Sequence, residues 1–210
     1  SFMTRPGLPN FFSSGWHLHQ SIFNESKKDN LFVNYSKSKA PLSDIGMYFM
    51  GGILENTSAA TAFSTPTING YKRYAPNSFA PNFINWASEH RGALIRVLGG
   101  PNDPGTHIEN RAGEPCANPY LYLASQLTAG LEGIKNKTSP GKPDNKPYQS
   151  ENTLLPRNLN DSLSALETNE LFKQKFTKQF IDYFIQLKSS EIQRFESYVT
   201  DWEHREYFEV

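Results

Sequence analysis

The stretch that organises this chain is residues 67–111, TINGYKRYAPNSFAPNFINWASEHRGALIRVLGGPNDPGTHIENR. Its cations stand singly among large apolar residues instead of forming a charged run: Lys72, Arg73, Arg91, Arg96 and Arg111. A guanidinium group binds carboxylate and phosphate oxygens in pairs, so an arginine among apolar residues commonly holds an anion. We therefore expect several of these arginines to converge on an anionic substrate.

The same stretch predicts a loop followed by two strands. Residues 70–86 carry two prolines, which favours a loop. Residues 93–98 and 106–111 predict paired strands across the Gly- and Pro-rich turn at 99–105. Alternation then gives the second strand a polar face made of His107, Glu109 and Arg111.

A second polar face precedes this stretch, in residues 14–23 (SGWHLHQSIF). If this segment is a strand, one of its faces carries His17, His19 and Ser21. Two such faces opposed across a concave sheet would bring His17 to Glu109. A histidine and a glutamate can form half of the shell of a divalent cation that also meets phosphate oxygens. Two other interpretations remain open: the histidines are exposed on an edge strand, and Glu109 forms an ion pair with Arg96 or Arg111.

Helical patterns lie on both sides of these strands. Ser43 predicts the N-cap of a helix that continues to Leu54, and residues 58–63 predict a second, short helix. Another helix is expected to begin at Asn118, before Pro119. Its expected core stripe is Leu123, Leu127, Leu131 and Ile134.

The C-terminal part predicts a long loop and two further helices. Residues 138–158 are rich in Pro, Asn and Lys, and we expect Tyr148 to be exposed in this loop. A short helix is expected at 159–165 and a long amphipathic helix at 170–199. The aromatic stripe of the long helix indicates packing: Phe172, Phe176, Phe180, Tyr183, Leu187, Phe195 and Val199.

The 210 residues suffice for one large domain or two small ones with a hydrophobic core. Lys and Arg together number 21, as do Asp and Glu, so the zero net charge gives no general electrostatic reason to bind nucleic acid or an anionic membrane. The one cysteine, Cys116, excludes an internal disulfide, and we expect it to be small and buried. No apolar run reaches the ~18–20 residues of a transmembrane helix, so a cytoplasmic protein is expected.

Five motifs together resemble the C-terminal part of the glutamine synthetase catalytic domain: SGWHLHQS, PTINGYKRYAPNSFAP, ASEHRGALIRV, IENR and ANPYLYLASQLTAGLEGIKNK. They follow the family's order over nearly the whole chain. The resemblance implies an α+β fold with a curved, mainly antiparallel sheet that forms part of an open barrel and is backed by helices. It also implies that residues 1–210 lack the family's N-terminal small-sheet domain and first catalytic strands. We therefore expect an incomplete fragment that is inactive alone.

The activity implied by the resemblance is that of an ATP-dependent carbon–nitrogen ligase. Such an enzyme uses ATP to phosphorylate the side-chain carboxylate of glutamate or a similar amino acid. Ammonia or an organic amine then displaces phosphate from the acyl-phosphate. The implied cofactors are ATP and Mg or Mn, and the full-length parent is expected to be a homo-oligomer.

The resemblance also implies roles for individual residues. His17 and Glu109 correspond to ligands of the metal that bridges the ATP phosphates. The ATP-binding positions are His19, Ser21, Arg91, Arg96 and His107. The substrate-binding positions are Arg73, Arg91 and Arg111. Arg91 is also the expected catalytic residue, since it matches the arginine that stabilises the transferred phosphoryl group.

Two positions depart from the family pattern. Phe79 stands where the family's flap has a glutamate that shields the intermediate and deprotonates ammonium, and Phe12-Ser13 replaces an Asn-Gly that helps to hold glutamate. Both changes make the site more apolar, so we expect an amine or acceptor other than free ammonia. They also leave room for a non-catalytic structural or regulatory member of the fold. A guanidino kinase would not explain the HLH and IENR motifs together.

Overall fold

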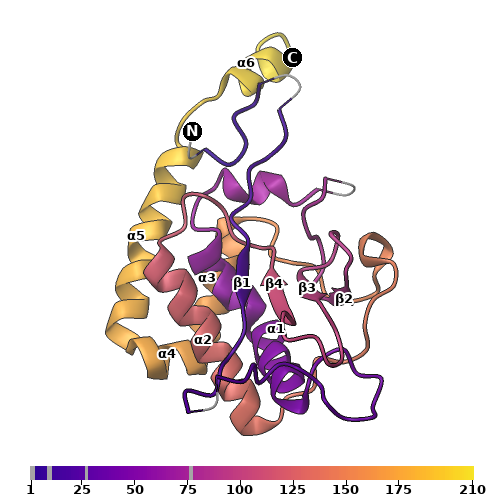
Figure 1. Cartoon of the computed structure of the whole chain (residues 1–210). Coiled ribbons are helices and arrows are strands. Elements are labelled where there is room, and N and C mark those ends of the chain that lie inside the picture. Colours follow the sequence, from indigo (N-terminus) through magenta and orange to yellow (C-terminus); the bar gives the residue numbers. More distant parts are fainter. Residues whose placement is uncertain (1–2, 9–10, 27, 76–77) are drawn as a thin grey trace.

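The computed structural model describes residues 3–8, 11–26, 28–75 and 78–210 and has an α+β architecture. Its four-stranded sheet has the order β1-β4-β3-β2 (Figure 1). The strands are β1 (Leu18–Gln20), β2 (Trp86–Ser88), β3 (Ile95–Leu98) and β4 (His107–Asn110). Two of the three pairings are antiparallel, and β2 pairs with β3 in parallel. The predicted antiparallel pair across the turn at 99–105 is confirmed, whereas β2 begins where the sequence predicted a loop.

The register of the sheet separates a polar face from an apolar one. Glu109 lies directly between His19 on β1 and Arg96 on β3, so these three side chains share a face. The neighbouring positions face the core, and the fully buried ones include Ile95, Val97 and Ile108. β1 and β2 are the two edges of a sheet that does not close on itself. The expected part of an open barrel therefore stays a prediction.

The helix α1 (Asp44–Ser64) forms the centre of the helical layer. Its N-cap is Ser43, as predicted, and the Ser43 hydroxyl accepts a hydrogen bond from the amide of Gly46. The prediction of two separate helices here is wrong, because α1 continues without a break through residues 58–63. In Figure 1, α1 runs behind the sheet, and α2, α4 and α5 lie together beyond the β1 edge.

The helix α2 (Pro119–Asn136) begins at the predicted cap Asn118, but it buries a different face from the expected one. Leu123, Leu127 and Leu131 are about half exposed, and the face against α1 is built from Ser125, Gln126, Ala129, Gly130 and Gly133. Close approach of the two helices explains this choice. A Cβ atom added at Gly52 of α1 would lie 2.1 Å from the carbonyl oxygen of Ala129. Small residues occupy this interface because larger ones would separate the two backbones.

The predicted long C-terminal helix is divided into two. The last four helices are α3 (Leu159–Thr168), α4 (Glu170–Phe176), α5 (Lys178–Glu196) and α6 (Asp201–Tyr207). The break between α4 and α5 is at Thr177, whose φ of 69° is not helical. Only the first part of the aromatic stripe packs inward: Phe172 and Phe176 contact Phe63 of α1, and Phe180 stacks on Phe176. Phe184, which was not in the predicted stripe, also packs on Phe63. Tyr183, Leu187, Phe195 and Val199 are exposed.

Two shorter helices complete the described chain. The 3₁₀-helix η1 (Gly70–Arg73) carries Arg73, and η2 (Pro147–Gln149) carries Tyr148. Cys116 is exposed, so the expectation of a small buried residue is wrong. Among the described residues, no helix combines the length and the apolar character needed to cross a lipid bilayer.

Candidate active site

The polar face of the sheet forms the wall of a cavity of about 370 Å³. Three strands and two loops contribute its lining. His19, Arg96 and Glu109 lie on β1, β3 and β4, His17 and Arg111 lie next to the ends of β1 and β4, and Phe79 and Arg91 lie on loops. Six of these seven residues belong to the set predicted from sequence to bind metal, ATP or substrate. The seventh is Phe79, which departs from the family pattern.

Glu109 is the centre of this cavity, although its side chain is only 3% exposed. Its Oε1 atom lies 2.9 Å from His17 Nδ1 and 2.5 Å from Arg111 Nη1, and its Oε2 atom accepts from Arg96 Nη1 at 3.3 Å. The predicted meeting of His17 and Glu109 is therefore present. The alternative ion pairs of Glu109 with Arg96 and Arg111 are present as well.

The environment of Glu109 strongly favours its charged form. Burial acts to raise the pKa of this carboxyl, but the hydrogen bond from His17 and the charge of Arg111 outweigh it and lower the pKa to about 2. Burial also lowers the pKa of the Arg111 guanidinium, and Glu109 opposes this. The carboxylate and the guanidinium thus keep each other charged in a partly desolvated place.

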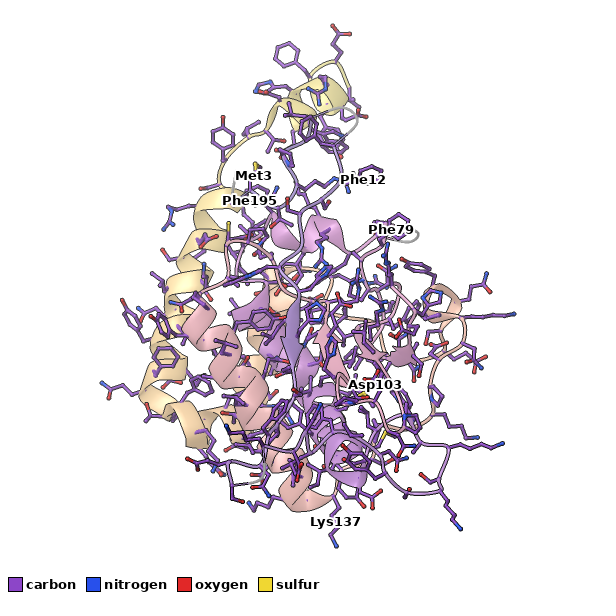
Figure 2. The ribbon with its side chains drawn as sticks, in the orientation of Figure 1. Met3, Phe12, Phe79, Asp103, Lys137 and Phe195 are labelled. Atoms are coloured by element: carbon purple, nitrogen blue, oxygen red, sulfur yellow. The ribbon has the colours of Figure 1, made fainter. Side chains whose placement is uncertain are left out.

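Arg111 is held in a fixed position by groups on three sides. Its Nε atom donates to the carbonyl oxygen of Arg91 at 2.9 Å, and its Nη2 atom donates to that of Phe79 at 3.1 Å. Phe79 has a φ of 58°, a backbone conformation that non-glycine residues rarely adopt. Its ring is 61% exposed and lines the cavity. Figure 2 shows Phe79 and Phe12 at the same end of the molecule.

Arg73 is placed differently from the other predicted substrate-binding arginines. It is buried, and its guanidinium donates to the carbonyl oxygens of Arg111 (2.7 Å) and Ala112 (3.0 Å). Its Nη2 atom also lies 3.2 Å from His17 Nε2. If Nε2 accepts this hydrogen bond, Nδ1 of His17 carries the proton and donates it to Glu109. Arg73 therefore holds the wall of the cavity and orients His17 from behind.

Arg91 and Arg96 present their charges in different ways. Arg91 is exposed at the cavity, whereas Arg96 is held by a pair of glutamates. Glu89 accepts from Arg96 Nη2 at 2.8 Å, on the opposite side from Glu109. Glu89 is a site residue that sequence reasoning missed. It stands after β2, a strand that the pattern did not predict, so no periodicity placed it beside Arg96.

The remaining predicted ATP-binding residues form an adjoining hollow of about 290 Å³. His19 lines both this hollow and the main cavity, and Ser21 and His107 line the hollow. His107 Nδ1 lies 2.6 Å from the carbonyl oxygen of Gly105, which assigns the proton to Nδ1. His107 Nε2 then accepts from His19 Nδ1 at 3.0 Å. His19 thus joins the two hollows, and His107 supports it from the side of the smaller one.

Gly15 is a second residue that sequence reasoning passed over. A Cβ atom at this position would lie 2.6 Å from His17 Nε2 and 2.8 Å from Arg73 Nη2. Glycine leaves room here for the ends of both side chains, which a larger residue would force to shift. Its position two residues before His17 was the available signal.

The cavity is built for anions more than for a complete metal shell. Four arginines stand against the two carboxylates of Glu89 and Glu109, so positive charge is in surplus. Within the described residues, no group of three or more His, Cys, Asp or Glu side chains is arranged to hold a metal ion. His17 and Glu109 supply two donors of the kind that a divalent cation accepts. The fit is therefore to a cation that takes its other ligands from phosphate, water or further protein groups.

Comparison with known proteins relates the whole chain to one family. Residues 1–207 match the family model described as glutamine synthetase, catalytic domain. The chain is 43% identical to a gamma-glutamylanilide synthase of Acinetobacter sp over 223 residues, which cover 100% of the chain and 44% of that relative. It is 36% identical to a glutamine synthetase of Methanococcus maripaludis, and this match covers 48% of that relative. It is 35% identical to a glutamine synthetase of Archaeoglobus fulgidus, and this match covers 45% of that relative. Both matches cover 100% of the chain. The chain thus spans about half the length of the curated relatives it matches.

Proposed function

Because this chain belongs to the glutamine synthetase catalytic-domain family, we propose that it supplies part of the active site of an ATP-dependent carbon–nitrogen ligase. The reaction joins the side-chain carboxylate of glutamate, or of a similar amino acid, to an amine through an acyl-phosphate. One observation carries the proposal. The His17–Glu109 pair lies in the same cavity as Arg91, Arg96 and Arg111, so the two donors that we assign to a metal and the arginines that we assign to anions lie together.

The arginines supply the electrostatic part of this chemistry. ATP, a carboxylate substrate and a transferred phosphoryl group bring several negative charges together, and cations gathered in one cavity stabilise the charge that develops between them. Arg91 has the exposed guanidinium that could follow the phosphoryl group. We assign Arg96 to phosphate and Arg111 to the amino-acid substrate. Arg73 acts through His17 and the backbone of residues 111–112.

A divalent cation, Mg or Mn, would be held by His17 and Glu109 and would supply charge neutralisation between phosphate groups. The donor types fit this role. His17 would have to give up its Nδ1 proton, and Glu109 its contacts with Arg96 and Arg111, before the pair could hold a cation. Arg96 would then be free for the incoming phosphates and Arg111 for the amino-acid substrate. His19, Ser21 and His107 line the adjoining hollow, which we assign to the nucleotide.

We further propose that the acceptor is an organic amine. Phe79 places an aromatic ring at the cavity, and one relative is named for the synthesis of a gamma-glutamylanilide. An apolar ring stabilises an aromatic amine by burial but offers no carboxylate to an ammonium ion. The homo-oligomeric assembly, the cytoplasmic location and the barrel-like extension of the sheet belong to the same proposal.

Calorimetric titration with a non-hydrolysable ATP analogue and Mg tests the half-site directly. We expect binding to weaken by about tenfold in Glu109→Gln and in His17→Ala, because the first loses the carboxylate charge and the second loses the imidazole donor. His204→Ala, in the exposed helix α6, is the matched control and should bind as the wild type does. Equal binding by all four proteins would refute the assignment of His17 and Glu109.

Phosphate release by the full-length parent then separates a ligase from a non-catalytic member of the fold. We expect release from ATP to require both glutamate and an amine, with aniline supporting a higher kcat/KM than ammonium. Rates with ammonium that equal or exceed those with aniline would overturn the amine assignment and leave the ligase proposal intact. Absence of release with every amine would favour the non-catalytic interpretation.

A further inference from the structure

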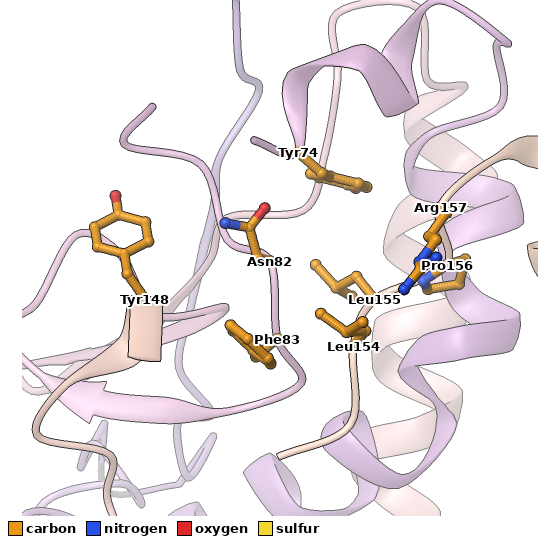
Figure 3. Close-up of a pocket in the computed structure, with 8 residues that line it drawn as sticks. All are labelled: Tyr74, Asn82, Phe83, Tyr148, Leu154, Leu155, Pro156 and Arg157. Atoms are coloured by element: carbon orange, nitrogen blue, oxygen red, sulfur yellow. The ribbon is translucent and has the colours of Figure 1, made fainter. Parts of the chain in front are cut away.

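A second pocket of about 410 Å³ lies apart from the cavity of Glu109 (Figure 3). None of its lining residues lines that cavity: Tyr74, Asn82, Phe83, Tyr148, Leu154, Leu155, Pro156 and Arg157. The backbone closes it on one side, where Leu155 N donates to the carbonyl oxygen of Asn82 at 2.9 Å and Ile84 N donates to that of Thr153 at 2.8 Å. The pocket is therefore a defined feature of the fold.

Two polar atoms of this pocket's residues are buried without a hydrogen-bond partner in the described chain, Asn82 Nδ2 and Tyr148 Oη. The expectation that Tyr148 is simply exposed is wrong, since its ring packs beside Gly92 and at 6.1 Å from the His90 ring. An amide nitrogen can only donate hydrogen bonds, so Asn82 Nδ2 needs a hydrogen-bond acceptor. A buried polar group without a partner destabilises the fold, and a suitable ligand atom would satisfy it.

Arg157 gives the opposite side of the pocket a positive charge. Its side chain is exposed, and within the described residues its guanidinium has no ion-pair partner. The nearby Asp161 carboxylate accepts instead from the backbone amide of Arg157, and the Asp161 amide donates to the N-cap Asn158. Figure 3 shows Arg157 and Asn82 on opposite sides of Leu155. No residue that lines the pocket carries a negative charge.

The walls between these two polar ends are apolar. Phe83, Leu154 and Leu155 supply carbon surface, and the ring of Tyr74 adds to it. The hydroxyl of Tyr74 is already paired with Thr65 Oγ1 and the carbonyl oxygen of Ala112, so this residue offers its ring to the pocket. The pocket thus has a cation at one end, hydrocarbon in the middle and, at the other end, the Asn82 amide with its nitrogen turned toward Tyr148 (Figure 3).

We propose that this pocket binds a small aromatic carboxylate that carries a hydrogen-bond acceptor on the side of the ring opposite the carboxylate. The carboxylate pairs with Arg157, the ring lies against Phe83 and Leu155, and the far acceptor takes the hydrogen bond of Asn82 Nδ2. A protonated amine does not fit, because it would bring a cation to Arg157 and donors to Asn82. The site is therefore distinct from the amine and glutamate positions of the proposed reaction, and it stands whether or not the chain belongs to an active ligase.

A titration with 4-hydroxybenzoate, followed by backbone amide shifts, tests the proposal on the full chain. We expect saturable shifts at the residues that line the pocket. Arg157→Gln should weaken binding about tenfold, because it removes the paired charge from an exposed residue without disturbing the core. Asn82→Leu should also weaken it and should reduce the preference for 4-hydroxybenzoate over benzoate. Arg194→Gln, an exposed arginine of α5, is the matched charge control and should have no effect.

Several results would overturn the proposal. The first is the absence of saturable shifts up to about 10 mM probe. The second is a loss of binding in Arg91→Gln but not in Arg157→Gln. The third is that 4-hydroxybenzylamine binds as tightly as 4-hydroxybenzoate. The second result would assign the probe to the arginine cavity, and the third would show an amine site. If Asn82→Leu does not fold, the Arg157→Gln variant and the amine probe still decide the question.

Discussion

At the scale of single residues, Glu109 concentrates the electrostatics of the cavity. Two guanidinium groups and the imidazole of His17 contact its two oxygens, the imidazole of His19 lies 3.8 Å from Oε1, and its side chain is almost fully buried. A lone buried carboxylate would be costly, and so would a lone buried guanidinium at Arg111. Each group is therefore stable here because the other is present, which makes the pair sensitive to protonation.

This sensitivity predicts a specific dependence of stability on pH. The pKa of Glu109 falls from its ordinary 4.5 to about 2 in the folded chain, so between these values the unfolded chain binds more protons. Stability contributed by Glu109 is complete above about pH 4.5 and is lost as the pH falls toward 2, by about 2–3 kcal/mol. Urea unfolding from pH 7 to about pH 3 should show a smaller loss for Glu109→Gln than for the wild type. Glu25→Gln, at an exposed glutamate, should keep the wild-type slope.

Gly15 gives a second prediction, which concerns space and not charge. A methyl group there would collide with His17 and Arg73, so Gly15→Ala should move both side chains and lower the free energy of unfolding by about 1–3 kcal/mol. The ¹⁵N shifts of the His17 ring report the displacement. Gly100→Ala is the control, since a Cβ atom at Gly100 meets nothing within 4 Å. Identical behaviour of the two variants would mean that Gly15 does not position His17.

Much of this cavity could be predicted from sequence, because strand alternation is a simple rule. Alternation alone places His17 and His19 on the face that meets Glu109, and the ion pairs of Glu109 follow from the arginines on the same strands. Alternation could not foresee Glu89, which depends on a parallel strand pairing. Nor could it foresee that Arg73 is occupied by backbone carbonyl oxygens, since carbonyl positions depend on the path of the chain between elements.

At the scale of elements, α2 shows why an apolar stripe does not always mark a core. Its buried face carries Gln126, whose Oε1 atom accepts from Asn110 Nδ2 at 2.6 Å. Gln126→Leu should therefore lower the free energy of unfolding by about 1–3 kcal/mol, because it leaves the Asn110 amide without its partner. Leu127→Gln, one position along and about half exposed, should change it by less than about 0.5 kcal/mol. Chemical denaturation of both variants measures the difference, and a larger effect at Leu127 would contradict the structure.

Periodicity located α2 and its cap correctly but gave the wrong face. Helix spacing fixes which residues share a side, and the partner decides which side is buried. Here the backbones of α1 and α2 come so close at Gly52, Ala129 and Gly133 that only small residues fit at these positions. The break at Thr177 was equally hidden, since the apolar spacing of Phe172, Phe176 and Phe180 continues across it while the backbone does not.

At the scale of the whole molecule, residues distant in sequence are tied together beside the cavity. Glu114 is fully buried and accepts hydrogen bonds from the hydroxyl of Thr4 and from the amide (2.9 Å) and hydroxyl (2.8 Å) of Thr67. Thr67 leads into η1, which carries Arg73, and the carbonyl oxygen of Thr4 accepts from Ser14 N at 2.9 Å. One carboxylate thus connects the segment before His17 with the helix that holds His17 from behind.

Glu114→Ala should release this connection. We expect the free energy of unfolding to fall by about 2–4 kcal/mol, because a buried acceptor is lost and the Thr67 amide is left unpaired. Hydrogen exchange at the amides of Thr67 and Ser14 should accelerate by about tenfold or more, beyond the change in global stability. Glu132→Ala, which removes only exposed contacts near the end of α2, including that with Lys135, serves as the control. If exchange accelerates at Thr67 but stays unchanged at Ser14, the segment before His17 is held by other contacts. Glu114 then anchors η1 alone, and the positions of His17 and Arg73 are set independently.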